Sequence, residues 1–337
     1  MKAREGDLLE TLEGAIFDVK GLVHPSDRIV AFIRFFLKEK GDRKKNGLSY
    51  QKVYSLSERY SLLRENFPTY LVYDPVFDET LCEVPIDSVK KHFDPVKKLR
   101  QLRSSKTLDT VENKALQLAE LLKRNSNIPW STIGISGSIL ARLHKIGSDI
   151  DPIVYGSANC QRVHSTLQEM FGDPHSSLKR YSQHELRSLF DFRSKDTLMG
   201  FEEFVRTESR KAFQGKFTKT DYFIRFVKNW NEVDEKYGDI QYRNIGYAKI
   251  RATIADDSES IFTPCKYMLE KTAIIDGPRL PQITEISSFR GRFCEQAKNG
   301  EMVVAQGKVE RVTDMKQSQE HFRLLIGNKP SDCMVLV

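Results

Sequence analysis

The sequence predicts an α+β protein in which a central mixed sheet with helices lies between two β-rich domains. Three observations lead to this prediction: apolar runs separated by turns at the beginning of the chain, an amphipathic stripe followed by alternating strand and helix patterns in the middle, and period-two alternation towards the end. The length of 337 residues allows two or three domains. We place them at residues 1–85, 86–235 and 236–337.

The beginning of the chain has a β pattern. Residues 14–23 and 28–36 are apolar runs on either side of a Pro-containing turn, which predicts a β-hairpin. Shorter strands at residues 52–56 and 71–73 are expected to flank a helix near residues 57–66. Together these elements describe a small β-rich domain.

An amphipathic helix opens the middle of the chain. Between Thr107 and Lys123, apolar residues recur at the spacing i, i+4, i+7 and i+11, at Val111, Ala115, Leu118 and Leu122. The segment from Lys90 to Arg124 carries ten basic and four acidic residues. Such a run is typical of a solvated helical face, and it is also able to follow a phosphate backbone.

Strands and helices then alternate. We expect a strand at 132–136, a helix at 139–145, a strand at 149–155 and a helix at 160–171, followed by a strand at 221–228. This order is typical of an α/β or α+β layer. The three strands are expected to share one mixed sheet, with helices over one of its faces.

The end of the chain returns to a β pattern. Residues 247–254, 259–262 and 302–312 alternate with period two and are separated by turn signals. They predict a second β-rich domain, for which a barrel is one form.

Composition excludes several classes of protein. The chain has 53 basic and 46 acidic residues, a net charge of +7 that mildly favours polyanionic partners. No apolar run approaches the roughly 18 residues of a membrane span, and no apolar signal core follows the first residues, so we expect a cytoplasmic protein without a membrane partner. The five cysteines are scattered and form no CxxC pair, which argues against disulfides and a structural zinc site.

Gly137 and Ser138 are the first candidate functional residues. They follow a predicted strand and begin a predicted helix, where free backbone N–H groups can bind an anion and glycine permits close approach. We interpret this turn as a phosphate site. The alternative is an ordinary tight turn with a helix cap.

Asp149 and Asp151 are the second candidates. Because side chains alternate along a strand, both carboxylates are expected on one face. Two such charges favour a divalent cation between them, and Mg²⁺ is held by carboxylates together with substrate phosphates. A solvated strand edge is the alternative. The two candidate pairs, joined by a short helix, are less easily explained by chance than either alone.

Gly137, Ser138, Asp149 and Asp151 together resemble the signature of the DNA polymerase β-type nucleotidyltransferase superfamily. The whole chain resembles a group of archaeal proteins described as predicted nucleotidyltransferases, and this likeness also covers residues 203–211, 257–264 and 289–297. The resemblance implies an enzyme that transfers a nucleoside monophosphate from an NTP to a hydroxyl, with two Mg²⁺ or Mn²⁺ ions and release of pyrophosphate. It leaves the acceptor unidentified.

The resemblance also assigns roles to individual residues. Gly137 and Ser138 would hold the triphosphate, with Ser148 as a further nucleotide contact, and Asp149 and Asp151 would ligate the metals.

A third carboxylate is expected on a neighbouring strand. Asp221 begins the best candidate strand and Arg225 lies in its middle, so by alternation Asp221 would be a catalytic metal ligand and Arg225 a phosphate contact. Both could instead face solvent. Asp191 and Glu208 are the other candidates, and without a third acid the site would bind nucleotide without transferring it.

The segment Phe289 to Phe293 is a weaker candidate for nucleic-acid binding. It interleaves aromatic rings with Arg290 and Arg292, a combination that can stack on bases and contact phosphates. The same alternation describes an ordinary half-buried strand. The alternative function is therefore a non-catalytic protein that binds nucleic acid or nucleotide, with RNA as a possible partner beside the NTP.

Overall fold

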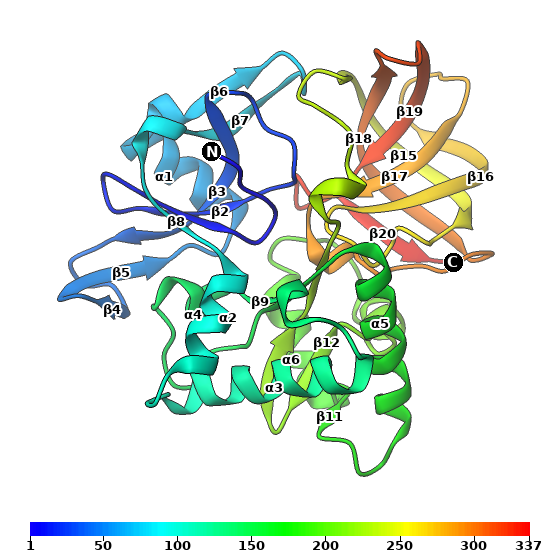
Figure 1. The fold of residues 1–337 in the computed structure, drawn as a ribbon. Coiled ribbons are helices and arrows are strands. Elements are labelled where there is room, and N and C mark those ends of the chain that lie inside the picture. The colour runs from blue at the N-terminus through cyan, green and yellow to red at the C-terminus, as the bar shows by residue number, and fades with distance from the viewer.

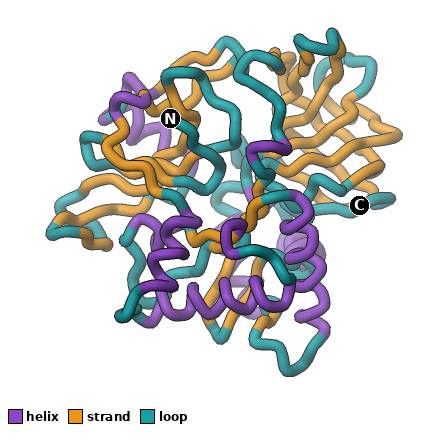
Figure 2. The backbone as a smooth tube through the Cα atoms, viewed as in Figure 1, coloured by secondary structure: helices purple, strands orange, loops and turns teal.

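The computed structural model describes residues 1–337 and has a mixed α+β architecture with several sheets. Figure 1 shows two β-rich parts, formed by the N-terminal and C-terminal segments, above a central part that contains most of the helices. Figure 2 shows the same division by element type, with the helices concentrated in the lower half of the view. The predicted fold class is confirmed at this level.

The N-terminal part is a sheet that carries one helix. Its elements are β1 (Leu8–Thr11), β2 (Ile16–Val19), β3 (Arg28–Leu37), β4 (Arg43–Lys45), β5 (Leu48–Lys52), α1 (Leu56–Asn66), β6 (Leu71–Asp74), β7 (Glu79–Pro85) and β8 (Val89–Phe93). Strands β2 and β3 pair antiparallel, so the predicted hairpin is confirmed. Strand β8 pairs with β1, so this sheet extends beyond the expected boundary at residue 85.

The central part contains the mixed sheet. Its elements are α2 (Pro95–Ser104), α3 (Thr110–Ser126), β9 (Ile133–Ile135), α4 (Gly137–Ala141), β10 (Pro152–Tyr155), α5 (Ser157–Gly172), β11 (Leu178–Lys179), α6 (Gln183–Arg193), α7 (Phe201–Glu208), β12 (Gln214–Phe217), β13 (Thr220–Phe223) and β14 (Arg225–Val227). The strand order is β14-β10-β9, with β10 parallel to β14 and antiparallel to β9. The expected mixed sheet is confirmed, and the predicted stripe of α3 is buried.

The two faces of this sheet have different neighbours. Ile150, Val154 and Phe226 belong to the core that contains α3 and α5, whereas Ile153, Tyr155 and Val227 form a separate small core with Leu22 of the N-terminal part. Helices therefore cover one face, as the sequence predicts. The other face is turned towards the N-terminal sheet.

The C-terminal part is a closed barrel. Its strands are β15 (Ile240–Asp256), β16 (Cys265–Asp276), β17 (Ile283–Ser288), β18 (Met302–Asp314), β19 (Gln319–Leu325) and β20 (Cys333–Leu336). Because β15 pairs with both β16 and β18, the order β15-β16-β17-β19-β18 closes on itself, and β17 and β19 are parallel. The sixth strand, β20, adds to this barrel by pairing with β18. The barrel is as anticipated, but the expected strand at 259–262 is wrong, because these residues form a turn with one isolated bridge.

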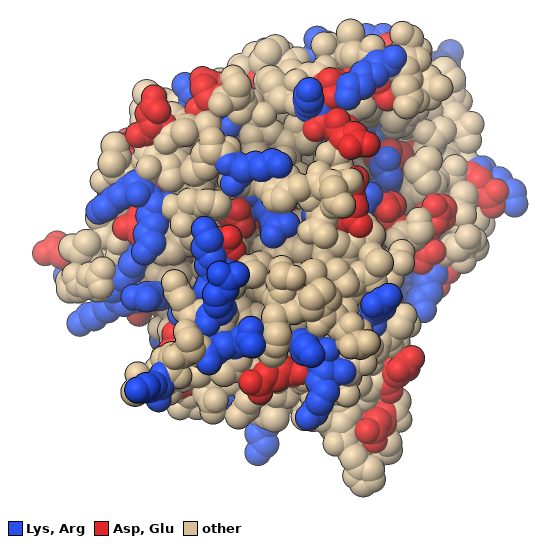
Figure 3. All heavy atoms as spheres, in the orientation of Figure 1, with Lys and Arg blue, Asp and Glu red and all other residues tan.

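The surface charge is uneven. Figure 3 shows Lys and Arg side chains gathered over the region of α2 and α3 and the nearby edge of the N-terminal sheet. None of the helices is both long and apolar enough to cross a membrane. The five cysteines are free thiols, as expected, and four of them are buried.

Candidate functional site

A cleft of about 1490 Å³ lies between the three parts of the molecule. It is lined by the open face of the central sheet, by the N-terminal sheet and α1, and by strands of the barrel. Of the residues expected at the site, Ser148, Asp149, Asp151, Asp221 and Arg225 line this cleft. Gly137 and Ser138 do not.

Asp149 and Asp151 are held by the backbone between them. Ile150 forms a parallel bridge with Tyr222, and its amide donates to the carbonyl oxygen of Asp221 over 2.9 Å. Strand β10 begins at Pro152, so both aspartates lie just before it, and the prediction of a strand over residues 149–155 is wrong at its beginning. Both carboxylates are nevertheless partly buried and reach the same cleft. Neither forms a hydrogen bond or an ion pair within the chain. They are two unpartnered acids on the face of the sheet that helices leave open.

Burial, followed by the charge of Asp149, raises the pKa of Asp151 to about 7. The neighbouring glycine explains how this carboxylate fits: a Cβ atom at Gly137 would lie 1.8 Å from Oδ2 of Asp151, and Gly137 has a φ of +60°. Only glycine avoids both the clash and the strain. Gly137 therefore makes room for Asp151, a contact that the sequence did not indicate.

The two serines have different surroundings. Ser138 is buried, and its hydroxyl has no partner within the chain. The hydroxyl of Ser148 accepts a hydrogen bond from the amide of Lys145 over 3.0 Å, which closes the turn before Asp149. Helix α4 is only five residues long, shorter than expected.

Asp221 lies on the neighbouring strand, but the carboxylate oxygens of Asp149, Asp151 and Asp221 do not all lie within 4.8 Å of one another. The register that places Tyr222 beside Ile150 places Asp221 beside Asp149. Its side chain is 48% exposed and forms an ion pair with Nζ of Lys216, at a distance of 2.9 Å. The other two candidates for a third carboxylate lie elsewhere: Asp191 is exposed on α6 outside the cleft, and Glu208 is enclosed in a paired cluster.

Arg225 joins the central sheet to the N-terminal part. Its Nη1 atom lies 2.9 Å from Glu5 Oε1 and 3.3 Å from Asp18 Oδ1. Burial alone lowers the pKa of a guanidinium, but the charges of Asp18 and Glu5 outweigh it and raise the pKa of Arg225. The guanidinium is therefore engaged by two acids within the chain, in addition to lining the cleft.

The chain is similar over nearly its whole length to the uncharacterized protein MJ1086 of the archaeon Methanocaldococcus jannaschii. The two sequences are 32% identical over 336 residues, which cover 97% of this chain and 96% of the relative. The chain belongs to the family of this archaeal protein. No family model matches the sequence, and no solved structure matches it.

In this family member the opposite wall of the cleft carries three basic side chains beside Asp18, a group that the sequence did not reveal. Arg34 of β3, Lys52 of β5 and Arg59 of α1 line the cleft, and none of their side chains forms a hydrogen bond or an ion pair within the chain. Burial, followed by the charge of Arg34, lowers the pKa of Lys52 to about 8 and that of Arg59 to about 10. They come from different elements of a domain remote in sequence from the aspartates, so local patterns give no signal for them.

Arg290 and Arg292 do not form the strand that alternation predicts. Gly291–Phe293 is a short 3-10 helix. Arg290 donates to Asp196 over 3.2 Å, and Arg292 donates to the carbonyl oxygen of Arg193 over 3.1 Å and to the hydroxyl of Thr197 over 2.8 Å. Although both line the cleft, their guanidinium groups are bound within the chain, so the expected exposed strip of rings and guanidinium groups is absent.

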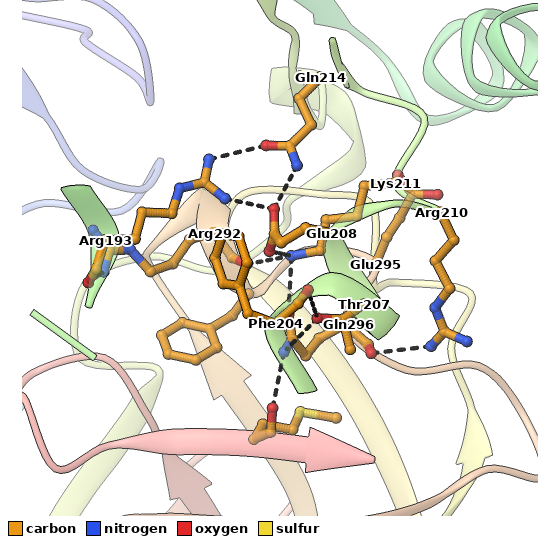
Figure 4. Close-up of polar contacts among 12 residues, drawn as sticks. Arg193, Phe204, Thr207, Glu208, Arg210, Lys211, Gln214, Arg292, Glu295 and Gln296 are labelled. Carbon is orange, nitrogen blue, oxygen red and sulfur yellow. Dashed lines mark hydrogen bonds and ion pairs between the residues drawn. The ribbon is translucent and has the colours of Figure 1, made fainter. Parts of the chain in front are cut away.

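The segments 203–211 and 289–297 meet in one buried cluster (Figure 4). Glu208 accepts from Arg193 over 2.5 Å, from Lys211 over 2.6 Å and from Gln214. Lys211 also donates to the side chain of Gln296 over 2.9 Å, and Gln296 donates to the carbonyl oxygen of Met334 over 2.8 Å. This cluster ties the helical part to the barrel.

A second group of acids lies outside the cleft. The ligand atoms of Asp109, Glu112 and His144 lie within 4.8 Å of one another. However, Asp109 caps α3 and also accepts from His144 over 2.6 Å, and Glu112 pairs with Lys98 over 2.8 Å. These acids already have partners.

Proposed function

We propose that the protein is a metal-dependent nucleotidyltransferase whose reaction takes place at Asp149 and Asp151. The observation that carries this proposal is the pair of unpartnered carboxylates on the open face of the sheet, inside a cleft with basic groups opposite. Two neighbouring acids without a partner fit a hard divalent cation such as Mg²⁺ or Mn²⁺, because oxygen ligands are the ones these ions prefer. Asp221 of the adjacent strand would supply a third oxygen donor if its side chain left Lys216 and turned towards the pair.

The proposed reaction moves a nucleoside monophosphate. The oxygen of an acceptor hydroxyl forms a bond to the α-phosphorus of the NTP, the bond from that phosphorus to the bridging oxygen breaks, and pyrophosphate leaves. The hydroxyl proton passes to a carboxylate of the site. The bound metal supplies charge neutralisation on the phosphates and lowers the pKa of the attacking hydroxyl. Asp149 and Asp151 would hold it, Asp221 would approach it from the neighbouring strand, and Gly137 leaves the space that Asp151 occupies.

The size of the cleft supports a two-substrate reaction. Small-molecule pockets usually occupy about 300 to 1,000 Å³. The cleft here has about 1490 Å³ and is lined by all three parts of the molecule. It has room for a nucleotide beside the hydroxyl-bearing end of an acceptor.

The second candidate is a protein that binds nucleic acid or nucleotide without transferring it. The observation that favours it is the strand order of the barrel, which is shared with oligonucleotide-binding domains. The surroundings of Asp221 also favour it, because this carboxylate is half exposed and already paired with Lys216. Barrel strands line the cleft, so the same surface would serve an RNA acceptor in the first proposal and an RNA ligand in the second.

Transfer of label separates the two candidates. The protein is incubated with each NTP labelled at the α-phosphate, with Mg²⁺, and with RNA, protein or small-molecule acceptors in turn. The enzyme proposal expects covalent label on one acceptor and equimolar pyrophosphate, both lost in Asp149→Asn and retained in Asp191→Asn, an exposed acid outside the cleft. Binding of RNA without any labelled product would favour the second candidate.

A further inference from the structure

Three basic side chains in the cleft lack partners within the chain. Lys52 is 8% exposed, Arg34 and Arg59 are partly buried, and Nε of Arg59 is fully buried with no acceptor. Removing a charge from water is unfavourable unless a counter-charge or hydrogen bonds replace the solvent. A group of such charges is therefore expected where an anionic ligand completes the site.

The N-terminal sheet brings the three cations together. Strands β3 and β5 pair with Phe35 opposite Lys52, and the amide of Val53 donates to the carbonyl oxygen of Arg34 over 3.0 Å. The guanidinium of Arg59 reaches the same place from α1, 5.6 Å from the ring of Phe32. The charge of Arg34 lowers the pKa of both Lys52 and Arg59, so Arg34 repels each of the other two groups.

Neighbouring cations differ from these three. Arg43 donates to the carbonyl oxygen of Leu143 over 2.7 Å, and Lys20 pairs with Glu5 over 3.0 Å and with Asp18 over 2.9 Å. These groups have the partners expected of buried charges. Arg43 and Lys20 also line the cleft, so the lack of hydrogen-bond and ion-pair partners distinguishes Arg34, Lys52 and Arg59 from the other cations of the same wall.

The carboxylates of Asp149 and Asp151 lie across the cleft from the three cations and form no ion pair with them. The charges of Asp149 and Asp151 act to raise the pKa of Lys52, and the charges of Lys52 and Arg34 act to lower the pKa of Asp151. Yet no nitrogen of the three cations lies within 4.0 Å of a carboxylate oxygen. Opposite charges that face each other across a gap suit a ligand that carries a metal on one side and several anionic oxygens on the other.

We propose that Arg34, Lys52 and Arg59 form an oligophosphate-binding wall, supplied by the N-terminal domain, that holds the triphosphate of the nucleotide against Asp149 and Asp151. The identification of the ligand as a nucleotide rests on the proposed function. The binding of an oligophosphate anion does not. A phosphate group of the acceptor has the same chemistry, and the experiment distinguishes it from the triphosphate.

Inorganic triphosphate is titrated calorimetrically into the full chain in the presence of EDTA, so that no divalent metal contributes. The variant Arg34→Gln/Lys52→Gln should bind at least about tenfold more weakly, about 1.4 kcal/mol. The control Lys44→Gln, an exposed cation of the same sheet outside the cleft, should bind like the native protein. Asp149→Asn should bind as well or more tightly, because it removes a repelling charge. Equal affinity in the double variant and the control would overturn the proposal.

Two further measurements test the fold of the double variant and the identity of the anion. Thermal unfolding should show that the double variant is at least as stable as the native chain, because it removes unpaired charges, and Arg34→Lys should retain most of the affinity. In a competition titration, MgATP should displace triphosphate. If MgATP and triphosphate bind at the same time, the wall does not bind the triphosphate of the nucleotide and would bind a phosphate group of the acceptor instead. If the native protein binds triphosphate but transfers no label to any acceptor, the proposed function is refuted and the oligophosphate-binding wall is not.

Discussion

Two groups of charged side chains in this protein use similar residue types but differ in their hydrogen bonding. In the cluster around Glu208, every charge has a partner: Lys211 donates to Glu208, to Gln296 and to a backbone carbonyl. In the cleft, Asp149 and Asp151 on one wall and Lys52 on the other have none. Buried charges that serve stability are paired. The difference separates a structural joint from a site that a ligand completes, and it predicts opposite effects of mutation.

The largest expected effect is in the paired cluster. Lys211 is fully buried, and Lys211→Met would leave part of the charge of Glu208 uncompensated. We expect the free energy of unfolding to fall by about 3 to 5 kcal/mol, measured by urea denaturation. The control Arg210→Ala removes a partly exposed pair with Glu301 and should cost about 1 kcal/mol. Similar small losses in both variants would mean that the cluster is not a structural joint.

Next is the close contact beneath the carboxylate pair. Gly137→Ala places a Cβ atom where Oδ2 of Asp151 lies and forces alanine to a φ of +60°. Destabilisation of about 3 kcal/mol is expected from the strain and the displaced carboxylate. Gly147→Ala is the matched control, since Gly147 also has positive φ but a Cβ there meets nothing within 4 Å. If the two variants lose equal stability, backbone strain alone accounts for the effect and the contact with Asp151 does not matter.

The unpaired acid should also make stability depend on pH. Because the pKa of Asp151 is raised from 3.8 to about 7, the folded state binds more protons than the unfolded state between these values. The free energy of unfolding of the metal-free protein should therefore fall as pH rises from about 4 to 7, by on the order of 2 kcal/mol from this group. Asp151→Asn should remove this part of the slope. An identical pH profile for the native chain and the variant would contradict the raised pKa.

The smallest effect is expected on the basic wall. Lys52→Met removes a charge that has no partner in the chain, so the free energy of unfolding should stay the same or rise by about 1 kcal/mol. Chemical denaturation of Lys52→Met beside Lys211→Met compares an unpaired with a paired lysine of similar burial. A comparable loss of stability in both would remove the distinction between the two regions.

Sequence patterns within single segments predicted individual elements of the fold. The stripe through Val111 and Leu122 gave α3, and Asp149 and Asp151 reach the same cleft, as their spacing indicates. Alternation failed at Phe289 to Phe293, because Arg290 is held by Asp196 from a distant loop and the segment turns instead of extending.

Other features depend on contacts between distant segments. The packing of Asp151 onto Gly137 arises when β9 pairs with β10 in the central part, and the approach of Arg34 and Lys52 to the aspartates arises only when the N-terminal part packs against it. The closure of the barrel depends on the pairing of β15 with β18, which is equally remote in sequence. No pattern within a single segment contains this information.

The central claim is that Asp149 and Asp151 bind the metal ion of a metal–nucleotide complex. Calorimetric titration of MgATP tests it most directly. Asn at either position keeps the shape of the side chain but removes the charge that holds the metal. We predict that affinity falls at least about tenfold in Asp149→Asn and in Asp151→Asn, and is unchanged in Asp191→Asn. Native affinity for MgATP in both cleft variants would contradict the account.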